Sequence, residues 1–255
     1  MQRFKDGVRR VSRRFEELAW EPTAIGEVSL RRRRDPVTGV DVFEVKLGDA
    51  YLMSSQFTVA EIALADLALG WLGRREIPTT GWEVVVGGLG LGYTAAAVLA
   101  ADPGGPRGVV GALAPVISWH RRELVPLGRM LTTDPRCRLE LGDFFAMVQE
   151  VGFDPEAPDR RFDAVLVDID HSPRHQLGVG NTDFYAESGL GRLAARLTPD
   201  GVFGLWSNDP PDQDYLDVLR AVFTTVSAEV VAFPNPLQQR QATSTVYLAS
   251  GTKTT

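Results

Sequence analysis

Two aspartates and a histidine follow an apolar run in the second half of the sequence. Residues 164–167 are Ala-Val-Leu-Val, and Asp168, Asp170 and His171 come soon after them. If the run is a buried strand, Asp168 lies at its carboxyl end, and Asp170 can face the same side. Carboxylates placed in this way can hold an amine and accept the proton that it loses on attacking an electrophile. In the alternative interpretation, Asp170 and His171 are ordinary loop residues.

A glycine-rich segment follows an earlier apolar strand. Residues 84–86 are all valine, and residues 87–92 read Gly-Gly-Leu-Gly-Leu-Gly before a predicted helix. Glycines at such a junction let the backbone turn sharply and approach a ligand, and the helix N-terminus offers free N–H donors. The pattern favours a nucleotide site over a turn without a ligand. An NAD site also needs an acid at the end of the next strand, and residues 109–113 contain none.

Two further aspartates lie near the ends of predicted strands. Asp143 precedes a helix, so it can cap that helix, accept a hydrogen bond from an adenine amino group, or do both. Asp209 belongs to Ser-Asn-Asp-Pro-Pro, residues 207–211. Because two prolines end both strands and helices, this segment is mainly a loop terminator. Asp209 is a weaker candidate for lining a substrate pocket.

The elements that must position these residues are predicted from the apolar pattern. Residues 1–58 contain β runs around a Pro/Gly turn and form a small N-terminal β-hairpin domain. A helix over 58–72 follows, with Thr58 as N-cap and Glu61 completing a capping box. From residue 82 strands and helices alternate, which predicts an α/β, Rossmann-like fold with a mostly parallel sheet and helices on both faces. This second domain covers 59–250, and 251–255 form a frayed end.

The boundaries predicted for this alternating part follow from the same pattern. The strands are 83–86, 108–112, 137–141, 164–168, 202–206 and 245–248, and the helices are 94–101, 116–131, 144–151, 184–197 and 214–223.

Composition restricts the class of protein. Hydrophobic residues make up 44%, enough for a full core, and no run approaches the roughly 20 apolar residues of a membrane-spanning helix. The first residues lack the apolar core of a secretory signal, so we expect a cytoplasmic protein that does not bind membranes. The net charge of −6 argues against nucleic-acid binding. The basic N-terminal arginines are interpreted as solvated: Arg9, Arg10, Arg13, Arg14 and Arg31 to Arg34.

Cysteine and histidine give no sign of a metal site or a disulfide. Cys137 is the single cysteine, so it cannot form an intrachain bridge, and no Cys/His spacing indicates zinc. His120 and His175 have no partner visible in the sequence, and we expect both on the solvated surface.

The order of these features resembles that of the spermidine synthases, over roughly residues 24–250. The likeness is carried by the hairpin, Gln56-Phe57-Thr58, the glycine loop, Gly142-Asp143, Val167-Asp168, and Phe184-Tyr185 ahead of residues 197–202. Enzymes of that family have the class I methyltransferase fold with a small N-terminal β domain and often form dimers. They move an aminopropyl group from decarboxylated S-adenosylmethionine to an amine. The resemblance implies the same fold, a homodimer, and a small-molecule amine as second substrate.

By position, the resemblance also assigns roles to individual residues. Asp168 would be the base, with Asp170 close enough to act as a second carboxylate. Asp143 would contact the adenine, and Gln56 would lie beside the nucleoside. Gly88 and Gly90 would line the nucleoside pocket, and His171 and Asp209 would face the acceptor.

Several residues differ from the family pattern. Leu91 stands where the family carries an aspartate that holds the aminopropyl amine, and Gly111 or Leu113 stands where it carries a ribose-binding acid. A buried amine without its carboxylate partner costs several kcal/mol. Two alternatives therefore stay open. One is a methyltransferase that uses intact S-adenosylmethionine on a small nucleophile, and the other is a binding or scaffold protein without catalysis.

Overall fold

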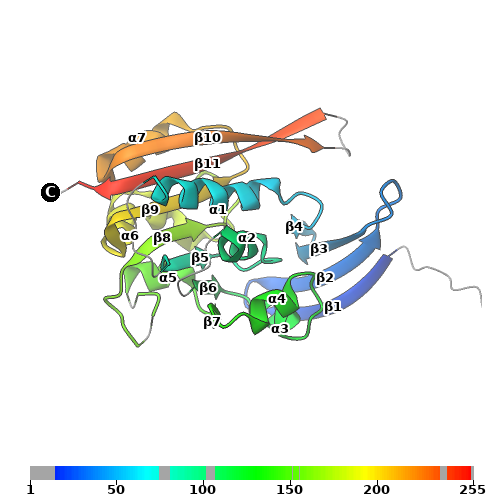
Figure 1. The fold of residues 1–255 in the computed structure, drawn as a ribbon. Helices are drawn as coiled ribbons and strands as arrows, with labels where there is room; N and C mark the ends of the chain where they lie inside the picture. The colour runs from blue at the N-terminus through cyan, green and yellow to red at the C-terminus, as the bar shows by residue number, and fades with distance from the viewer. Residues whose placement is uncertain are drawn as a thin grey trace, which may run out of the picture. The chain divides into compact units, whose positions relative to one another are not determined.

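The computed structural model describes residues 15–74, 81–101, 107–150, 152–154, 156–235 and 240–253 (Figure 1). Its internal contacts divide the chain into two units, Met1–Gln56 and Phe57–Thr255. Within the described part of the chain, no helix is long and apolar enough to cross a membrane.

The N-terminal unit is an antiparallel sheet in the order β1-β2-β3-β4. The strands are β1 (Phe15–Thr23), β2 (Gly26–Arg34), β3 (Asp41–Leu47) and β4 (Ala50–Ser54). Its β2–β3 turn is closed by Asp35, whose side chain accepts hydrogen bonds from the backbone N–H groups of Val37 and Thr38. The sequence pattern did not predict β1, because glutamates and a proline interrupt its apolar alternation.

The arginines of β2 pair with acids on the neighbouring strands. Arg32 contacts Glu16 at 2.6 Å, and Arg33 contacts Glu44 at 2.7 Å. The Arg33 side chain is only 24% exposed, so the prediction of fully solvated arginines is wrong there. Arg9, Arg10, Arg13 and Arg14 lie outside the described residues.

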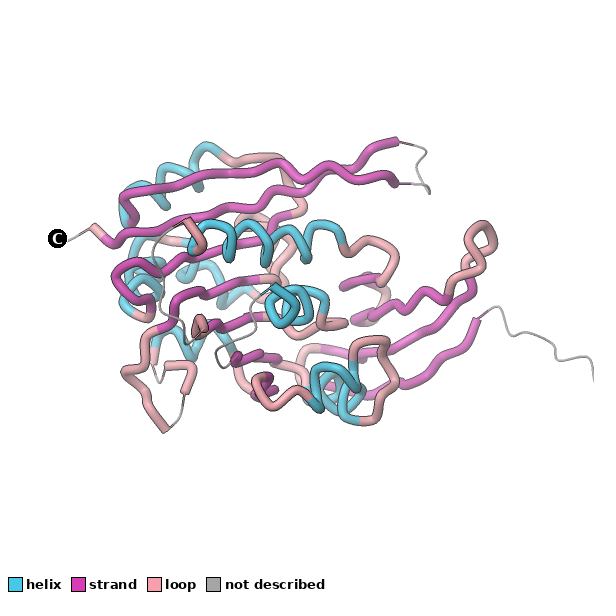
Figure 2. The backbone as a smooth tube through the Cα atoms, viewed as in Figure 1, coloured by secondary structure: helices cyan, strands magenta, loops and turns pink. Residues whose placement is uncertain are grey.

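The second unit contains a sheet in the order β10-β11-β9-β8-β5-β6-β7 (Figures 1 and 2). The strands from β9 to β7 run parallel, and β10 and β11 are antiparallel. The chain runs outward from β5 to β7 and then returns to β8 on the other side of β5. Ligands of open α/β sheets bind at the carboxyl edge beside such a reversal. The strands are β5 (Val84–Gly87), β6 (Arg107–Gly111), β7 (Cys137–Leu141), β8 (Phe162–Val167), β9 (Leu197–Ser207), β10 (Phe223–Asn235) and β11 (Arg240–Thr252).

Helices cover both faces of this sheet, which confirms the predicted α/β class. Val85, Val165 and Phe203 belong to the core on one face, which includes residues of α5, α6 and α7. On the other face Leu64 of α1 lies over Leu166 and Gly204. The helices are α1 (Val59–Leu72), α2 (Tyr93–Ala101), α3 (Ala114–Arg121), α4 (Gly128–Thr133), α5 (Phe144–Gln149), the 3₁₀ helix η1 (Val179–Tyr185), α6 (Glu187–Ala195) and α7 (Gln213–Val222).

The structure differs from the predicted elements in four places. The helix expected over 116–131 is two helices, and between them Glu123 has φ +56°. Phe184 and Tyr185 belong to η1 rather than opening α6. The strand β10 was not predicted, although it pairs with β11 along nearly its whole length. Both Gly251 and Thr252, placed by the sequence pattern in a frayed end, lie in β11.

Candidate functional site

The glycine loop lies directly against the end of β8. The backbone N–H of Asp168 donates to the carbonyl of Gly87 at 2.8 Å, and that of Gly88 donates to Val110 at 3.0 Å. Gly88 has φ +102°, and a Cβ added there would lie 2.0 Å from the carbonyl oxygen of Asp168. Only glycine fits this backbone conformation and this close approach. The loop and Asp168 therefore form one site.

A buried histidine also contacts the glycine loop. His120 of α3 is fully buried, and its Nε2 lies 2.9 Å from the carbonyl oxygen of Gly90. Burial lowers the pKa of His120, so the neutral ring donates Nε2–H to that carbonyl. The prediction that His120 is a surface residue is wrong, because α3 packs its last turn against the glycine loop. A Cβ on Gly92 would lie 3.1 Å from this ring.

Asp168 is a carboxylate with a raised pKa. Its Oδ2 accepts a hydrogen bond from the hydroxyl of Thr94, the second residue of α2, at 2.9 Å. Burial raises the pKa of Asp168 to about 6, and the Thr94 hydrogen bond acts in the opposite direction. A group with this pKa is ionised at neutral pH and is still basic enough to take a proton.

A second acid, Glu61, lies near Asp168 and was missed as a site residue. The side chain of Thr58 makes no capping hydrogen bond, so the predicted capping box is wrong. Burial, and then the charge of Asp168, raise the pKa of Glu61 to about 8. The signal that could have found it is an acid at the border of the buried face of α1. That face contains Ala60, Leu64, Ala65, Ala68, Leu69 and Leu72.

Asp170 is buried and organises the loop that follows β8. It is 1% exposed and accepts hydrogen bonds from the backbone N–H of Leu177 and the hydroxyl of Tyr185, at 2.7 and 2.8 Å. The amide of Asn181 also donates to it. These contacts fix the start of the loop, and the role of Asp170 as a second catalytic carboxylate stays a prediction. The backbone carbonyl of His171 accepts a hydrogen bond from the backbone N–H of Asn208 at 2.8 Å. This bond joins the loop after β8 to the loop after β9.

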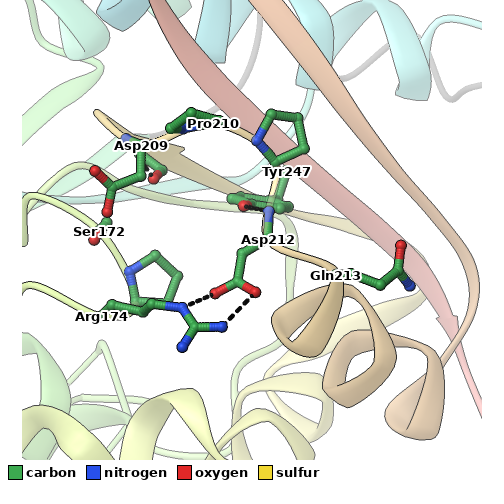
Figure 3. Close-up of a pocket in the computed structure, with 10 residues that line it drawn as sticks. Ser172, Arg174, Asp209, Pro210, Asp212, Gln213 and Tyr247 are labelled. Atoms are coloured by element: carbon green, nitrogen blue, oxygen red, sulfur yellow. Dashed lines mark hydrogen bonds and ion pairs between the residues drawn. The ribbon is translucent and has the colours of Figure 1, made fainter.

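A pocket of about 310 Å³ opens where those two loops meet (Figure 3). Asp209 lies in its wall, and Arg174 reaches across to Asp212. Hydrogen bonds from Ser172 and then from His175 are the main causes that lower the pKa of Asp209. The pocket is lined by Ser172, Pro173, Arg174, Ser207, Asp209, Pro210, Pro211, Asp212, Gln213 and Tyr247.

The contacts of His175 exclude a hydrolytic triad in this pocket. Its Nδ1 lies 2.9 Å from Asp209 and 3.2 Å from the Ser172 hydroxyl. A hydrolytic triad uses the two ring nitrogens separately, so these residues are not a triad. His175 is exposed as predicted, but its partner Asp209 was not visible in the sequence.

The remaining predicted residues lie in different places. Oδ1 of Asp143 accepts from the backbone N–H groups of Phe145 and Ala146, at 2.9 and 3.3 Å, so Asp143 caps α5. Gln56 lies in the N-terminal unit, where Arg33 donates to its side-chain oxygen at 2.6 Å. The contacts predicted for both residues with a nucleoside stay predictions.

Two acids of the spermidine synthase pattern have no polar counterpart at the same positions of this chain. Leu91 is fully buried and Gly111 ends β6, so neither position presents a carboxylate. Across the described segments, no group of three or more His, Cys, Asp or Glu side chains is arranged to hold a metal ion.

Comparison with known proteins identifies the fold. No protein-family model matches the sequence, and no curated protein matches it. A spermidine synthase crystallised with the transition state analogue AdoDATO is similar over 92% of this chain and 73% of that one, with a TM-score of 0.68 and 16% identity. A probable spermidine synthase from Corynebacterium glutamicum is similar over 92% of this chain and 79% of that one, with a TM-score of 0.64 and 14% identity. Human methyltransferase-like protein 13 in complex with SAH is similar over 76% of this chain and 80% of that one, with a TM-score of 0.51 and 19% identity.

These likenesses define the class of structure. The second unit has the class I methyltransferase fold. With its separate N-terminal sheet, the chain has the spermidine synthase-like form of that fold, which confirms the resemblance in fold predicted from the sequence.

Proposed function

We propose that this protein is a transferase that moves an aminopropyl-type group from an S-adenosyl sulfonium donor to a small-molecule amine. The observation that carries the proposal is Asp168, whose pKa is raised to about 6 at the carboxyl end of β8. Its backbone lies directly against Gly88 of the glycine loop. A base at this position can contact both the donor and the acceptor at the carboxyl edge of the sheet.

The reaction follows from the charges of the two substrates. The amine lone pair forms a bond to the carbon next to the sulfonium sulfur, the C–S bond breaks, and the sulfur leaves as a neutral thioether. The acceptor is an ammonium ion at neutral pH, so it must lose a proton before its lone pair can attack, and Asp168 is the group that accepts that proton. A positioned base of suitable pKa contributes about 10²- to 10⁴-fold to such a step.

The donor side of the site consists of the glycine loop and the residues that contact it. Gly88 and Gly90 would line the nucleoside pocket, with decarboxylated S-adenosylmethionine as the donor. His120 fixes the carbonyl of Gly90, which keeps the loop in one conformation. Asp143 is the further residue of this unit that we propose to contact the nucleoside.

The acceptor side is the loop region beyond β8 and β9. Asp209 has a lowered pKa and so presents a charged carboxylate in the pocket wall. His171 is joined to the β9 loop through its backbone carbonyl. A negatively charged pocket wall at this edge suits a cationic amine.

One observation favours a second function, methyl transfer from intact S-adenosylmethionine. Leu91 is buried in the position where the spermidine synthases carry the acid for the aminopropyl amine. A methyltransferase does not need that acid, because backbone groups can hold the methionine end of the donor.

A thermal-shift panel distinguishes the two functions. A ligand at a hundred times its Kd adds about 2.7 kcal/mol to the free energy of unfolding, a rise in Tm of roughly 5–10 °C for a chain of this size. Aminopropyl transfer predicts that decarboxylated S-adenosylmethionine and methylthioadenosine raise Tm most. Methyl transfer predicts that S-adenosylmethionine and S-adenosylhomocysteine do so. If no adenosyl compound shifts Tm, the proposal is wrong and the scaffold alternative stands.

A further inference from the structure

His120 is a buried titratable residue that contacts the glycine loop at two positions. Its Nε2 lies 2.9 Å from the carbonyl oxygen of Gly90, and a Cβ added to Gly92 would lie 3.1 Å from its Cε1 atom. Gly92 has φ +90°, so its backbone conformation and this contact both favour glycine. The same added Cβ would also meet Leu131 of α4. The second half of the loop therefore packs against α3 and α4.

The corner between α3 and α4 fixes the backbone of His120. Its carbonyl accepts a hydrogen bond from the backbone N–H of Glu123 at 3.0 Å, and Glu123 has φ +56°. A Cβ on Gly128, the first residue of α4, would lie 2.7 Å from the same carbonyl. Because α4 approaches the end of α3 this closely, the backbone from which the ring reaches the loop is held in place.

The second nitrogen of the His120 ring has no partner. The residue is fully buried, and Nδ1 forms no hydrogen bond with any described residue. When Nε2–H donates to Gly90, Nδ1 is the unprotonated nitrogen of a neutral ring. A proton added there would create a buried charge, which costs far more than a buried neutral nitrogen. The ring fits this position only in its neutral form.

The elements packed around the ring present no counter-charge. The loop presents glycines, α4 presents Leu131, and α2, which follows the loop, contains no charged residue. The charged residues nearby in the chain, 121–123 and Arg129, are exposed, and Asp168 contacts the loop at Gly88. Burial lowers the pKa of His120, and among the described residues no charged side chain raises it. Protonation therefore displaces the ring from the loop.

We propose that His120 is a positioning residue that makes nucleoside binding at the glycine loop depend on its own protonation state. The neutral ring holds the Gly90 carbonyl and keeps the loop in its binding conformation. When Nδ1 takes a proton from solvent, the ring leaves and the loop loses that conformation. The inference rests on the proposed function, because it takes the loop to bind the nucleoside of the donor.

Isothermal titration of the full chain with methylthioadenosine over a series of pH values tests the inference. This probe has no ammonium group, so its amine cannot cause a pH dependence. The affinity of the parent should be constant near pH 8 and fall by up to about tenfold per pH unit below the pKa of His120. That pKa lies under the ordinary value of 6.5.

Two substitutions separate the hydrogen bond from the titration. His120→Gln keeps an N–H donor that reaches about as far as Nε2 and does not titrate. It should bind within about threefold of the parent at pH 8 and lack the acid fall in affinity. His120→Leu loses the donor and should bind about 3- to 10-fold more weakly at pH 8.

Two controls assign the acid fall to His120. His175→Gln removes an exposed histidine, and Asp168→Asn removes the acid whose pKa is about 6. Both variants should keep the fall. If His120→Gln keeps it as well, or if the parent shows none before circular dichroism detects acid unfolding, the inference is wrong while the proposed function stands. If the parent does not bind methylthioadenosine at pH 8, the proposed function fails and the inference with it.

A measurement on the parent does not depend on whether the variants fold. The ¹⁵N NMR spectrum of the histidine rings, assigned with His175→Gln, should show His120 protonated at Nε2 alone at pH 8. Saturation with methylthioadenosine should lower the pKa of this ring, because the bound loop holds the neutral form. A ring that titrates identically with and without the ligand would overturn the inference.

Discussion

At the scale of single residues, the chemistry depends on the protonation state of Asp168. The free base is the reactive form, and burial raises the pKa of this group to about 6. The rate should therefore fall about tenfold per pH unit below pH 6 and become independent of this group above pH 7. A profile of kcat against pH, with decarboxylated S-adenosylmethionine and putrescine, measures this.

Replacing the same carboxylate tests its role directly. Asp168→Asn should lower kcat by about 10²- to 10⁴-fold and remove the acid limb of the pH profile. The affinity for methylthioadenosine, which has no ammonium group, should stay within about twofold. A variant that turns over at the parent rate would exclude Asp168 as the base.

The sequence shows single site residues when their signal is local. Asp168 and Gly88 were predicted because each follows an apolar strand within a few residues. Glu61 and His120 were not, because their burial depends on segments distant in the chain. Glu61 lies near Asp168, which follows β8, and His120 is buried where α3 contacts Gly90.

At the scale of elements, the glycine loop and the end of β8 act as one unit. Gly88→Ala should destabilise the protein by about 2 kcal/mol or more, because the new Cβ meets the Asp168 carbonyl and φ is positive. Tm should fall by roughly 4–8 °C. Scanning calorimetry measures the change.

A second glycine provides the control for this prediction. A Cβ on Gly191, inside α6, meets nothing within 4 Å. Gly191→Ala should raise stability by about 0.5–1 kcal/mol, because alanine is the better helix former. Equal effects of the two substitutions would show that the contact with Asp168 does not matter.

Element boundaries were predicted with uneven success. The strand β7 was predicted at its observed bounds. The break between α3 and α4 was missed, although Pro126 and Gly128 mark it, because the apolar spacing was followed through residues 116–131. The strand β10 was missed because its half-exposed, mixed sequence gains its structure from pairing with β11.

At the scale of the whole molecule, the homodimer implied by the family resemblance is still a prediction. Light scattering coupled to size-exclusion chromatography should give twice the 27.9 kDa of one chain. A mass that stays at one chain across a hundredfold range of concentration would contradict it.

The close approach of α1 to the sheet has an evolutionary consequence. Position 204 can gain a side chain only if positions 64 and 166 lose volume, because a Cβ there already meets both leucines within about 3 Å. Relatives that carry a larger residue at 204 should therefore carry smaller ones at 64 and 166. The history of this packing should be readable as covariation of position 204 with those two positions.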